Sequence, residues 1–201
     1  DRGLIRGPMI ALPFLKSSSQ PVRGERVHMR LPAATDFTPW ARLRSESRDF
    51  LTPWEPLWAP GDLERSSFRN RVRRYQEEAQ SGTGYPFFIF RNGDGRLVGG
   101  ITLSNVRRGV TQAGTIGYWM GAPYAGQGLM SEAVRLMIGF AFDALRLHRL
   151  EAACIPTNSR SIHLLEKAGF RREGLFRSYL KINGTWQDHL VFSLLEDDER
   201  K

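Results

Sequence analysis

The feature that most constrains this chain is a glycine-rich turn that joins a predicted strand to a predicted helix. Residues 115–120 are typical of a strand. Residues 127–145 carry apolar side chains at three- and four-residue intervals, which predicts a helix with one buried face. Gly126 and Gly128 lie at the junction. A strand followed directly by a long amphipathic helix is typical of folds in which helices cover a sheet.

The same turn has the chemistry of a phosphate site. The opening turn of a helix has unpaired backbone N–H groups and a partly positive dipole end, and glycines let a phosphate approach that backbone closely. The Gly126-x-Gly128 spacing is neither a P-loop nor a full dinucleotide fingerprint. Glycines at such a turn can also serve only to pack the helix on the sheet, so this segment alone leaves both interpretations open.

The rest of the chain predicts an α/β domain with a mixed sheet of about six to seven strands flanked by helices. Two prolines exclude a regular helix over residues 51–58, and the turns Asn92–Gly95 and Asn183–Gly184 predict hairpins. Further strands are expected at residues 26–31, 86–91, 97–103, 149–155, 174–182 and 186–195. Further helices are expected at residues 36–48, 62–81 and 159–168, with Asp36, Asp62 and Asn158 as N-caps and with Gly82 and Gly169 at two of the C-terminal ends.

Length and composition predict one domain. The 201 residues suit a single domain over residues 23–201, preceded by a flexible arm or an expression remnant at residues 1–22. The chain contains no apolar stretch long enough to span a bilayer, so no membrane association is expected. The single cysteine, Cys154, lies in an apolar run; it predicts a buried thiol without a disulfide, which suits the cytoplasm. The four histidines lack metal-ligand spacing, so no metal site is expected.

The net charge of +8 favours anionic partners, either a phosphate-rich cofactor or a substrate bound to RNA. The arginines between Arg65 and Arg74 would spread over several helix faces and indicate a solvated surface. No RNA-recognition motif with paired aromatic residues is visible, so sequence-specific nucleic-acid binding is not expected.

A second motif follows the next predicted strand. Asn158-Ser159-Arg160-Ser161 opens a short helix that Ala168-Gly169-Phe170 closes. Together with the glycine turn, in this order and spacing, it resembles the GNAT superfamily of N-acetyltransferases over about residues 24–196. In detail the chain resembles the bacterial Rim-type branch, which acetylates N-terminal alanine or serine of ribosomal proteins. Ile116-Gly117-Tyr118-Trp119, Leu51-x-x-Trp54-Glu55-Pro56 and the late Asn183-Gly184-Thr185-Trp186 segment carry that likeness. One departure is Pro123, where the superfamily often has glutamine or arginine.

The resemblance implies a GNAT fold in which two splayed parallel strands, near residues 116–121 and 149–155, hold acetyl-CoA. It implies that backbone N–H groups of the glycine turn bind the pyrophosphate, that the strand end pairs with the pantetheine arm, and that an N–H near Met120 polarises the acetyl carbonyl. The implied cofactor-binding residues are Tyr118, Met120, Gly121, Ala122, Gly126, Gln127, Gly128, Leu129, Met130, Ser131, Asn158 and Ser161.

The acceptor amine would attack directly, so no nucleophilic side chain is required. Glu55 is the candidate for holding or deprotonating the amine, and Ser161 is the candidate acid for the leaving thiolate. Each also has a structural interpretation: Glu55 as a surface carboxylate beside proline, and Ser161 as part of a helix cap. The predicted acceptor is a protein N-terminus. The alternatives are a small amine (a polyamine, an aminoglycoside or a toxin), or a non-catalytic role as a coenzyme A- or RNA-associated factor. Either a monomer or a homodimer is compatible with the sequence.

Overall fold

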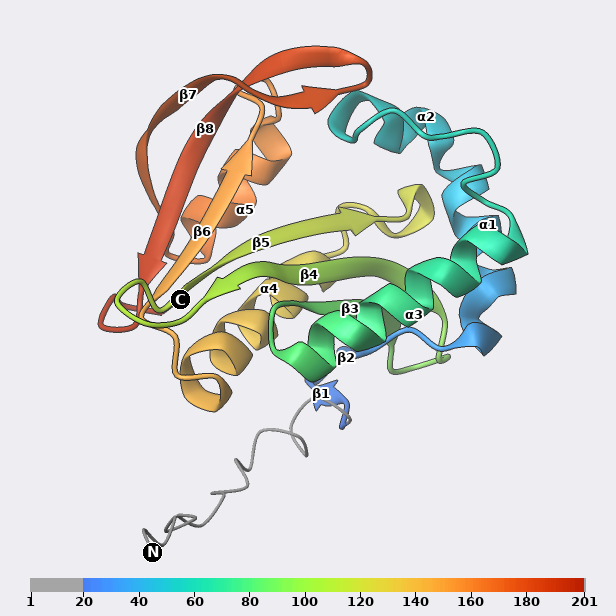
Figure 1. Cartoon of the computed structure of the whole chain (residues 1–201), viewed down its shortest axis with the longest axis horizontal. Coiled ribbons are helices and arrows are strands. Elements are labelled where there is room, and N and C mark those ends of the chain that lie inside the picture. The colour runs from blue at the N-terminus through green and yellow to red at the C-terminus, as the bar shows by residue number, and fades with distance from the viewer. Residues whose placement is uncertain (1–19, 201) are drawn as a thin grey trace, which may run out of the picture.

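The computed structural model describes residues 20–200, and its centre is one eight-stranded sheet (Figure 1). The strands run in the order β1-β2-β3-β4-β5-β6-β8-β7, and every neighbouring pair is antiparallel except β5 and β6. The strands are β1 (Val22–Arg23), β2 (Val27–Arg30), β3 (Tyr85–Arg91), β4 (Leu97–Arg107), β5 (Ala113–Met120), β6 (Arg149–Cys154), β7 (Arg171–Ile182) and β8 (Thr185–Leu195). The expected mixed sheet is confirmed.

Helices cover both faces of this sheet. In Figure 1, α3 lies in front of β3 and β4, whereas α4 lies behind them and α5 behind β6. The α-helices are α1 (Phe37–Glu46), α2 (Arg48–Leu51), α3 (Arg65–Ser81), α4 (Leu129–Gly139) and α5 (Ser159–Lys167). Short turns of helix complete the chain: η2 (Ala34–Asp36), η3 (Thr52–Trp54), η4 (Ala122–Tyr124) and the π-helical η5 (Phe140–Ala144), which continues α4.

The core has two parts because the central strands are buried on both faces. On β3, Phe87 and Ile89 pack with the apolar face of α4, whereas Phe88 and Phe90 pack with α1 and α3. Successive side chains of a strand point to opposite faces, so a strand covered on both sides is apolar throughout. This arrangement explains why residues 86–90 are continuously hydrophobic rather than alternating.

Some element boundaries differ from the prediction for identifiable reasons. The eighth strand, β1, has two residues and is too short for a periodic signal. Helix α3 begins at Arg65, because the predicted cap Asp62 binds Arg71 instead, at 2.8 Å. Asp36 does precede α1, but its carboxylate binds Arg30 and caps no N–H of that helix. The predicted arm lies largely in residues 1–19, outside the described range.

The parallel strands separate along their length. β5 and β6 pair only from Ala113 to Ile116 on one strand and from Arg149 to Ala152 on the other. Beyond Ile116, β5 stays paired with β4 on one side as far as Met120, while β6 stays paired with β8. The result is the predicted splay between two parallel strands at the centre of the sheet. Across residues 20–200, no helix has the length and apolar character needed to cross a membrane.

Candidate active site

The open edge of β5 offers backbone groups to a ligand. Alternate residues of a strand direct their N–H and C=O groups to opposite neighbours. The Gly121 N–H donates to Val98 O of the β4 side at 2.8 Å, so the groups of Met120 and Tyr118 point to the other side. There β6 no longer pairs with β5. The edge at Tyr118 and Met120 can therefore hydrogen-bond an extended ligand as a further strand would.

The backbone groups of Gly121 and Ala122, the next two predicted binding residues, are hydrogen-bonded within the chain. The Gly121 N–H is used by Val98, and the Ala122 N–H donates to Ser47 Oγ at 2.9 Å. The Gly121 carbonyl accepts from Tyr124 N–H, which closes the short η4 turn. These contacts hold the end of β5 against the helix α1. Gly121 and Ala122 thus shape the strand end and leave the open hydrogen-bonding positions to Tyr118 and Met120.

The glycine turn before α4 has the geometry of an anion site. Gly126 and Gly128 have φ values of +75° and +76°, a left-handed conformation that favours glycine. Both glycines and Gln127 are exposed, and a Cβ on Gly126 would meet nothing within 4 Å. Gly128 precedes the first residue of α4, and no side chain of the described residues caps that helix start. Residues 129–131, the remaining predicted contacts, form its first turn, where backbone N–H groups lack helical partners.

Arg26 adds a positive charge that the sequence did not reveal. It lies just before β2, about a hundred residues away in the chain, yet its Nη2 donates to the Gln127 carbonyl at 2.9 Å. Glu132 in the first turn of α4 holds this segment, because its Oε1 accepts from the Arg26 backbone N–H at 2.9 Å. A guanidinium beside an uncapped helix start favours a phosphate. Nothing in the local sequence around Arg26 indicates this position.

Asn158 and Ser161 lie on the other side of the splay. Asn158 caps α5, because its Oδ1 accepts from Ser161 N–H at 3.1 Å. The Ser161 hydroxyl is 2.7 Å from the Tyr118 hydroxyl, so this pair bridges α5 and β5. Burial raises the pKa of Tyr118 above its ordinary value near 10, although the Ser161 hydrogen bond lowers it in part. The Tyr118–Ser161 pair is therefore a protonated, hydrogen-bonded unit at neutral pH, placed beside the space between the strands.

Cys154 is buried near the same pair. Burial raises the pKa of its thiol above the ordinary value, and a hydrogen bond with Ser161 offsets part of that effect. A thiol that stays protonated is a poor nucleophile. The expected structural role of Cys154 agrees with this environment.

Glu55 is held in an ion-paired network at the end of η3. Its two carboxylate oxygens accept from Arg44 at 2.7 and 2.6 Å, and Oε2 also accepts from the Trp58 indole at 2.9 Å. The side chain is 18% exposed. The Glu55 carbonyl accepts from Asn183 N–H at 2.8 Å, so the β7–β8 hairpin touches this loop. The structure thus anchors Glu55 firmly rather than leaving it as a free surface carboxylate.

The structure brings most predicted residues to one region. Tyr118, Met120 and Ser161 surround the splay, and the glycine turn continues the chain beyond β5. The open strand edge offers unpaired backbone groups, and the exposed turn beside Arg26 offers backbone N–H groups and a positive charge. No group of three or more potential metal-ligating side chains is present among residues 20–200.

Comparison with known proteins identifies similar sequences over most of the chain. Residues 26–171 match the model of the acetyltransferase (GNAT) domain. A probable N-acetyltransferase of Bacillus subtilis, YjcK, is 38% identical over 180 residues, which are 90% of this chain and 99% of that protein. The alanine N-acetyltransferase of ribosomal protein uS5 from Escherichia coli is 33% identical over 174 residues, 87% of this chain and 90% of that protein.

Solved structures agree with this result. The ribosomal-protein-S5-alanine acetyltransferase of Vibrio fischeri superposes with a TM-score of 0.83 at 31% identity, covering 90% of this chain and all of that one. RimJ of Mycobacterium smegmatis, solved with a coenzyme A disulfide, superposes with a TM-score of 0.81 at 31% identity, covering 88% of this chain and 90% of that one.

Proposed function

Because this chain belongs to the GNAT acetyltransferase family and is an acetyl-CoA-dependent N-acetyltransferase, we propose that its acceptor is the N-terminal amine of a protein, specifically alanine or serine at the start of a ribosomal protein. The observation that carries this proposal is the 33% identity, over nearly its whole length, to the enzyme that acetylates ribosomal protein uS5. The net charge of +8 supports it, because an acceptor next to RNA would attract a basic enzyme. A cytoplasmic location follows from the same proposal.

In this proposal the chain holds acetyl-CoA from both sides of the splay. The Gly126–Gly128 turn, the first turn of α4 and Arg26 bind the phosphates, and the open edge at Tyr118 and Met120 binds the pantetheine arm. Asn158, already the cap of α5, supplies its side-chain amide from the opposite wall. Bound acetyl-CoA supplies an activated acetyl thioester.

The chain's own groups then orient the amine and move protons. The Met120 N–H points into the splay and polarises the acetyl carbonyl as an oxyanion donor. A neutral α-amine, whose ordinary pKa is near 8, attacks without an enzyme nucleophile. As the C–S bond breaks, Ser161 donates a proton to the departing thiolate and regains one from Tyr118 through their 2.7 Å contact. Tyr118 takes its proton back from water, and the acylated nitrogen releases its extra proton to water, so the protons balance. Glu55 holds the amine: each of its oxygens already accepts from Arg44, which fixes the carboxylate at the end of η3.

The test is thiol release from acetyl-CoA with alanine- and serine-starting peptides, the same peptides with blocked N-termini, and a panel of polyamines and aminoglycosides. Turnover only with free peptide N-termini is expected. Turnover only with small amines would overturn the proposed acceptor and leave the family assignment intact. Coenzyme A binding without turnover on any acceptor would instead favour a non-catalytic role.

Glu55→Gln tests the role of the carboxylate in the same assay. The glutamine keeps one oxygen acceptor for Arg44 and removes the charge. A raised KM for peptide with little change for acetyl-CoA is expected, because the only substrate group that the proposal places at Glu55 is the amine. A melting temperature measured alongside shows how much the lost charge pair with the buried Arg44 affects the fold. If neither the rate nor its pH profile changes, another group holds the amine.

A further inference from the structure

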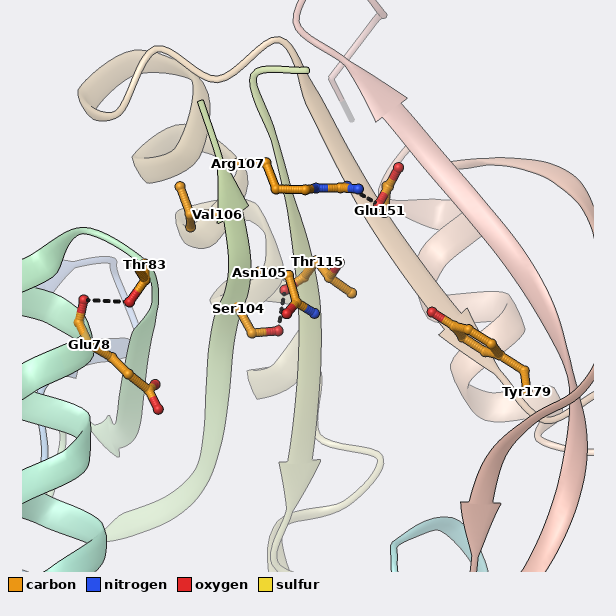
Figure 2. A pocket seen from close by; sticks show the side chains of 9 residues that line it. All are labelled: Glu78, Thr83, Ser104, Asn105, Val106, Arg107, Thr115, Glu151 and Tyr179. Atoms are coloured by element: carbon orange, nitrogen blue, oxygen red, sulfur yellow. Dashed lines mark hydrogen bonds and ion pairs between the residues drawn. The ribbon is translucent and has the colours of Figure 1, made fainter. Parts of the chain in front are cut away.

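A polar groove lies on the front face of the sheet, between α3 and β7, outside the site described above. Figure 2 shows it from close by, and its volume is about 560 Å³. Its walls come from five separate parts of the chain, so only the fold assembles it. The lining residues are Glu78, Thr83, Ser104, Asn105, Val106, Arg107, Thr115, Glu151 and Tyr179.

The floor of the groove is a row of paired polar side chains. Ser104 of β4 lies opposite Thr115 of β5, which in turn lies opposite Glu151 of β6. Directly paired residues of adjacent strands project to the same face of a sheet. The opposite face at these strands is the apolar core with α4. The row makes the floor of the groove polar, although the Ser104 hydroxyl already donates to the Thr115 carbonyl at 3.2 Å and Glu151 is paired with arginines.

Two strand irregularities face each other across this row. The β4–β5 register shifts between Ser104 and Arg107, and Asn105 there has a φ of +50°. The β7–β8 register shifts between Phe176 and Leu180, and Ser178 there has a φ of +45°. The left-handed conformation is unfavourable for serine and better tolerated by asparagine, and bulges re-aim neighbouring side chains. Both irregularities serve one result, which is that Asn105 and Tyr179 project toward the groove (Figure 2).

Asn105 and Tyr179 have hydrogen-bonding groups to offer. The Tyr179 ring is fixed by edge contacts with Phe176 and His189, at centroid distances of 5.1 and 5.7 Å. Within residues 20–200, no hydrogen bond engages its hydroxyl or the Asn105 side-chain amide. The β4 irregularity is itself held by Val106 N–H, which donates to Thr83 O at 3.1 Å. A positioned amide and a positioned hydroxyl can bind a peptide backbone, which presents alternating donors and acceptors.

The strand β5 leads from the groove floor at Thr115 to the proposed active site at Met120. Gly117 lies between Thr115 and Trp119 on the same face; it is exposed, and a Cβ there would meet nothing within 4 Å. From Thr115 to Met120 is five residues of strand, about 16 Å at about 3.3 Å per residue. An extended acceptor with its amine near Met120 would therefore reach Thr115 at about its fifth or sixth residue.

We propose that this groove binds the acceptor polypeptide downstream of the acetylated residue, with Asn105 and Tyr179 as the residues that hydrogen-bond its backbone. The inference rests on the proposed function, because it requires a peptide acceptor. Glu151 is already paired with Arg107 at 2.6 Å and Arg149 at 3.0 Å, whereas Glu78 lies 3.5 Å from Arg74. The less tightly paired Glu78 favours a basic side chain in the bound segment.

A peptide-length series tests the inference. Alanine-starting peptides of about two, four, six and eight residues span the distance to the groove. For the unmodified enzyme, KM for the peptide is expected to fall once the peptide is longer than about five residues. The fall should be about 3- to 10-fold for each hydrogen bond gained in the groove, and kcat should stay unchanged. Asn105→Gly keeps the left-handed backbone and removes the amide, and Tyr179→Phe removes only the hydroxyl. Each should reduce that gain for long peptides and leave the dipeptide KM unchanged.

Val110→Ala, at a fully exposed position of the β4–β5 loop, is the matched control and should behave as the unmodified enzyme at every length. Two results would overturn peptide binding in the groove and leave peptide acetylation standing. One is a KM that does not depend on peptide length, and the other is an equal rise in KM for short and long peptides in the variants. If no peptide of any length or sequence is acetylated, the proposed acceptor and the proposed role of the groove are both overturned. Melting temperatures within a degree or so of the unmodified enzyme verify that the variants fold.

Discussion

At the scale of single residues, the site depends on side chains whose roles come from distant partners. Arg44 shows this most clearly, because it is nearly buried and pairs with both carboxylate oxygens of Glu55. Its guanidinium also lies 4.3 Å from the ring centre of Trp58 and 4.9 Å from that of Trp119. A buried cation without its carboxylate is costly. The pair therefore fixes the position of the Glu55 carboxylate.

Ser161 and Tyr118 are linked by one hydrogen bond, and we expect unequal effects when either hydroxyl is removed. Ser161→Ala should lower kcat about 10- to 100-fold, because protonation of the thiolate loses its donor, whereas KM for acetyl-CoA should change little. Tyr118→Phe should reduce kcat less, because Ser161 stays in place through its N–H bond to Asn158. The measurement is kcat at saturating acetyl-CoA. Full turnover by Ser161→Ala would show that Ser161 is not the acid.

The Tyr118 environment also predicts the pH dependence of that pair. Burial raises the pKa of Tyr118, so its hydroxyl stays protonated as pH passes its ordinary value near 10. The rate at saturating substrates should therefore show no loss attributable to tyrosine ionisation up to about pH 10. A tyrosine-dependent fall at lower pH, absent in Tyr118→Phe, would contradict this environment.

Arg26 should contribute to acetyl-CoA binding through charge. Arg26→Ala should raise KM for acetyl-CoA several-fold and weaken its dependence on salt, because a guanidinium near phosphates is screened by ions. Arg69→Ala is a suitable control, since Arg69 is exposed on α3, which covers the face of the sheet opposite α4. Equal effects of the two substitutions would point to net charge rather than to a contact.

At the scale of elements, the proposed binding site depends on where β5 loses its β6 partner and how the chain then enters α4. The strand ends paired with β4 alone, and the next residues form the η4 turn and the two left-handed glycines. An open strand edge and an open helix start are thus separated by only a few residues. The two surfaces proposed to bind acetyl-CoA therefore come from a single continuous segment.

Gly126→Ala tests the turn. The substitution should cost about 1 kcal/mol of folding free energy, because φ is +75° while no atom crowds the new methyl group. It should also raise KM for acetyl-CoA, because the methyl group would occupy the space in front of the backbone. Gly109→Ala is the matched control: φ is +67° and the space is equally open, but the glycine lies in the β4–β5 loop. It should cost similar stability and leave KM unchanged; parallel KM changes would argue against a phosphate contact at Gly126.

The edge strand β7 is tied to the sheet by an ion pair that responds to acid. Arg149 of β6 and Ser193 of β8 donate to Glu173 and lower the pKa of that carboxyl to about 2. A lowered folded-state pKa stabilises the protein above the unfolded value near 4.5, and the contribution is lost as pH falls from there toward 2.

Glu173→Gln should therefore be less stable than the unmodified protein at pH 7, by up to about 1 kcal/mol because the pair is largely exposed. The difference should vanish as pH falls toward about 2. Urea unfolding at several pH values measures it. A difference that stays constant with pH would mean that packing rather than charge holds β7.

At the scale of the whole molecule, the splay separates the ends of β5 and β6, while the two parts of the sheet on either side of it share one buried core on the α4 side. One part contains β1–β5 with α1–α4, and the other contains β6–β8 with α5 (Figure 1). The short parallel pairing, the Tyr118–Ser161 bond and the contact of Asn183 with Glu55 join them. A ligand between β5 and β6 would touch both parts.

Acetyl-CoA should therefore stabilise the whole fold. At about 100 times its Kd, a ligand that binds only the folded state adds about 2.7 kcal/mol. For a chain of this size that corresponds to a rise in Tm of about 5–10 °C. Adenosine 3′,5′-bisphosphate, which would reach only the α4 side, should give a smaller shift when compared at the same concentration. Equal shifts in Tm for the two ligands would indicate that the pantetheine arm does not help to join the two parts of the sheet on either side of the splay.

Most of the architecture could be predicted because its signals are local. The two-residue hairpin Asn183–Gly184, the left-handed Gly82 and Gly169, and the apolar stripe of α4 each follow from neighbouring residues. The boundaries that differed, at Asp62 and Asp36, are those where a carboxylate prefers an arginine in the tertiary structure to a helix end. A helix-capping pattern in the sequence cannot show whether the carboxylate binds the helix end or an arginine, because the arginine is not part of that pattern.

The sequence by itself determined the fold class, the family, and the backbone chemistry of the glycine turn. All three depend on short-range spacing and on conformations that few residue types adopt. Only the tertiary structure decided that Arg26 lies beside Gln127, that Tyr118 meets Ser161, that Glu55 is bound to Arg44, and that Asn105 and Tyr179 face one groove. These contacts join segments far apart in the chain, and their geometry exists only once the sheet has set the strands in register.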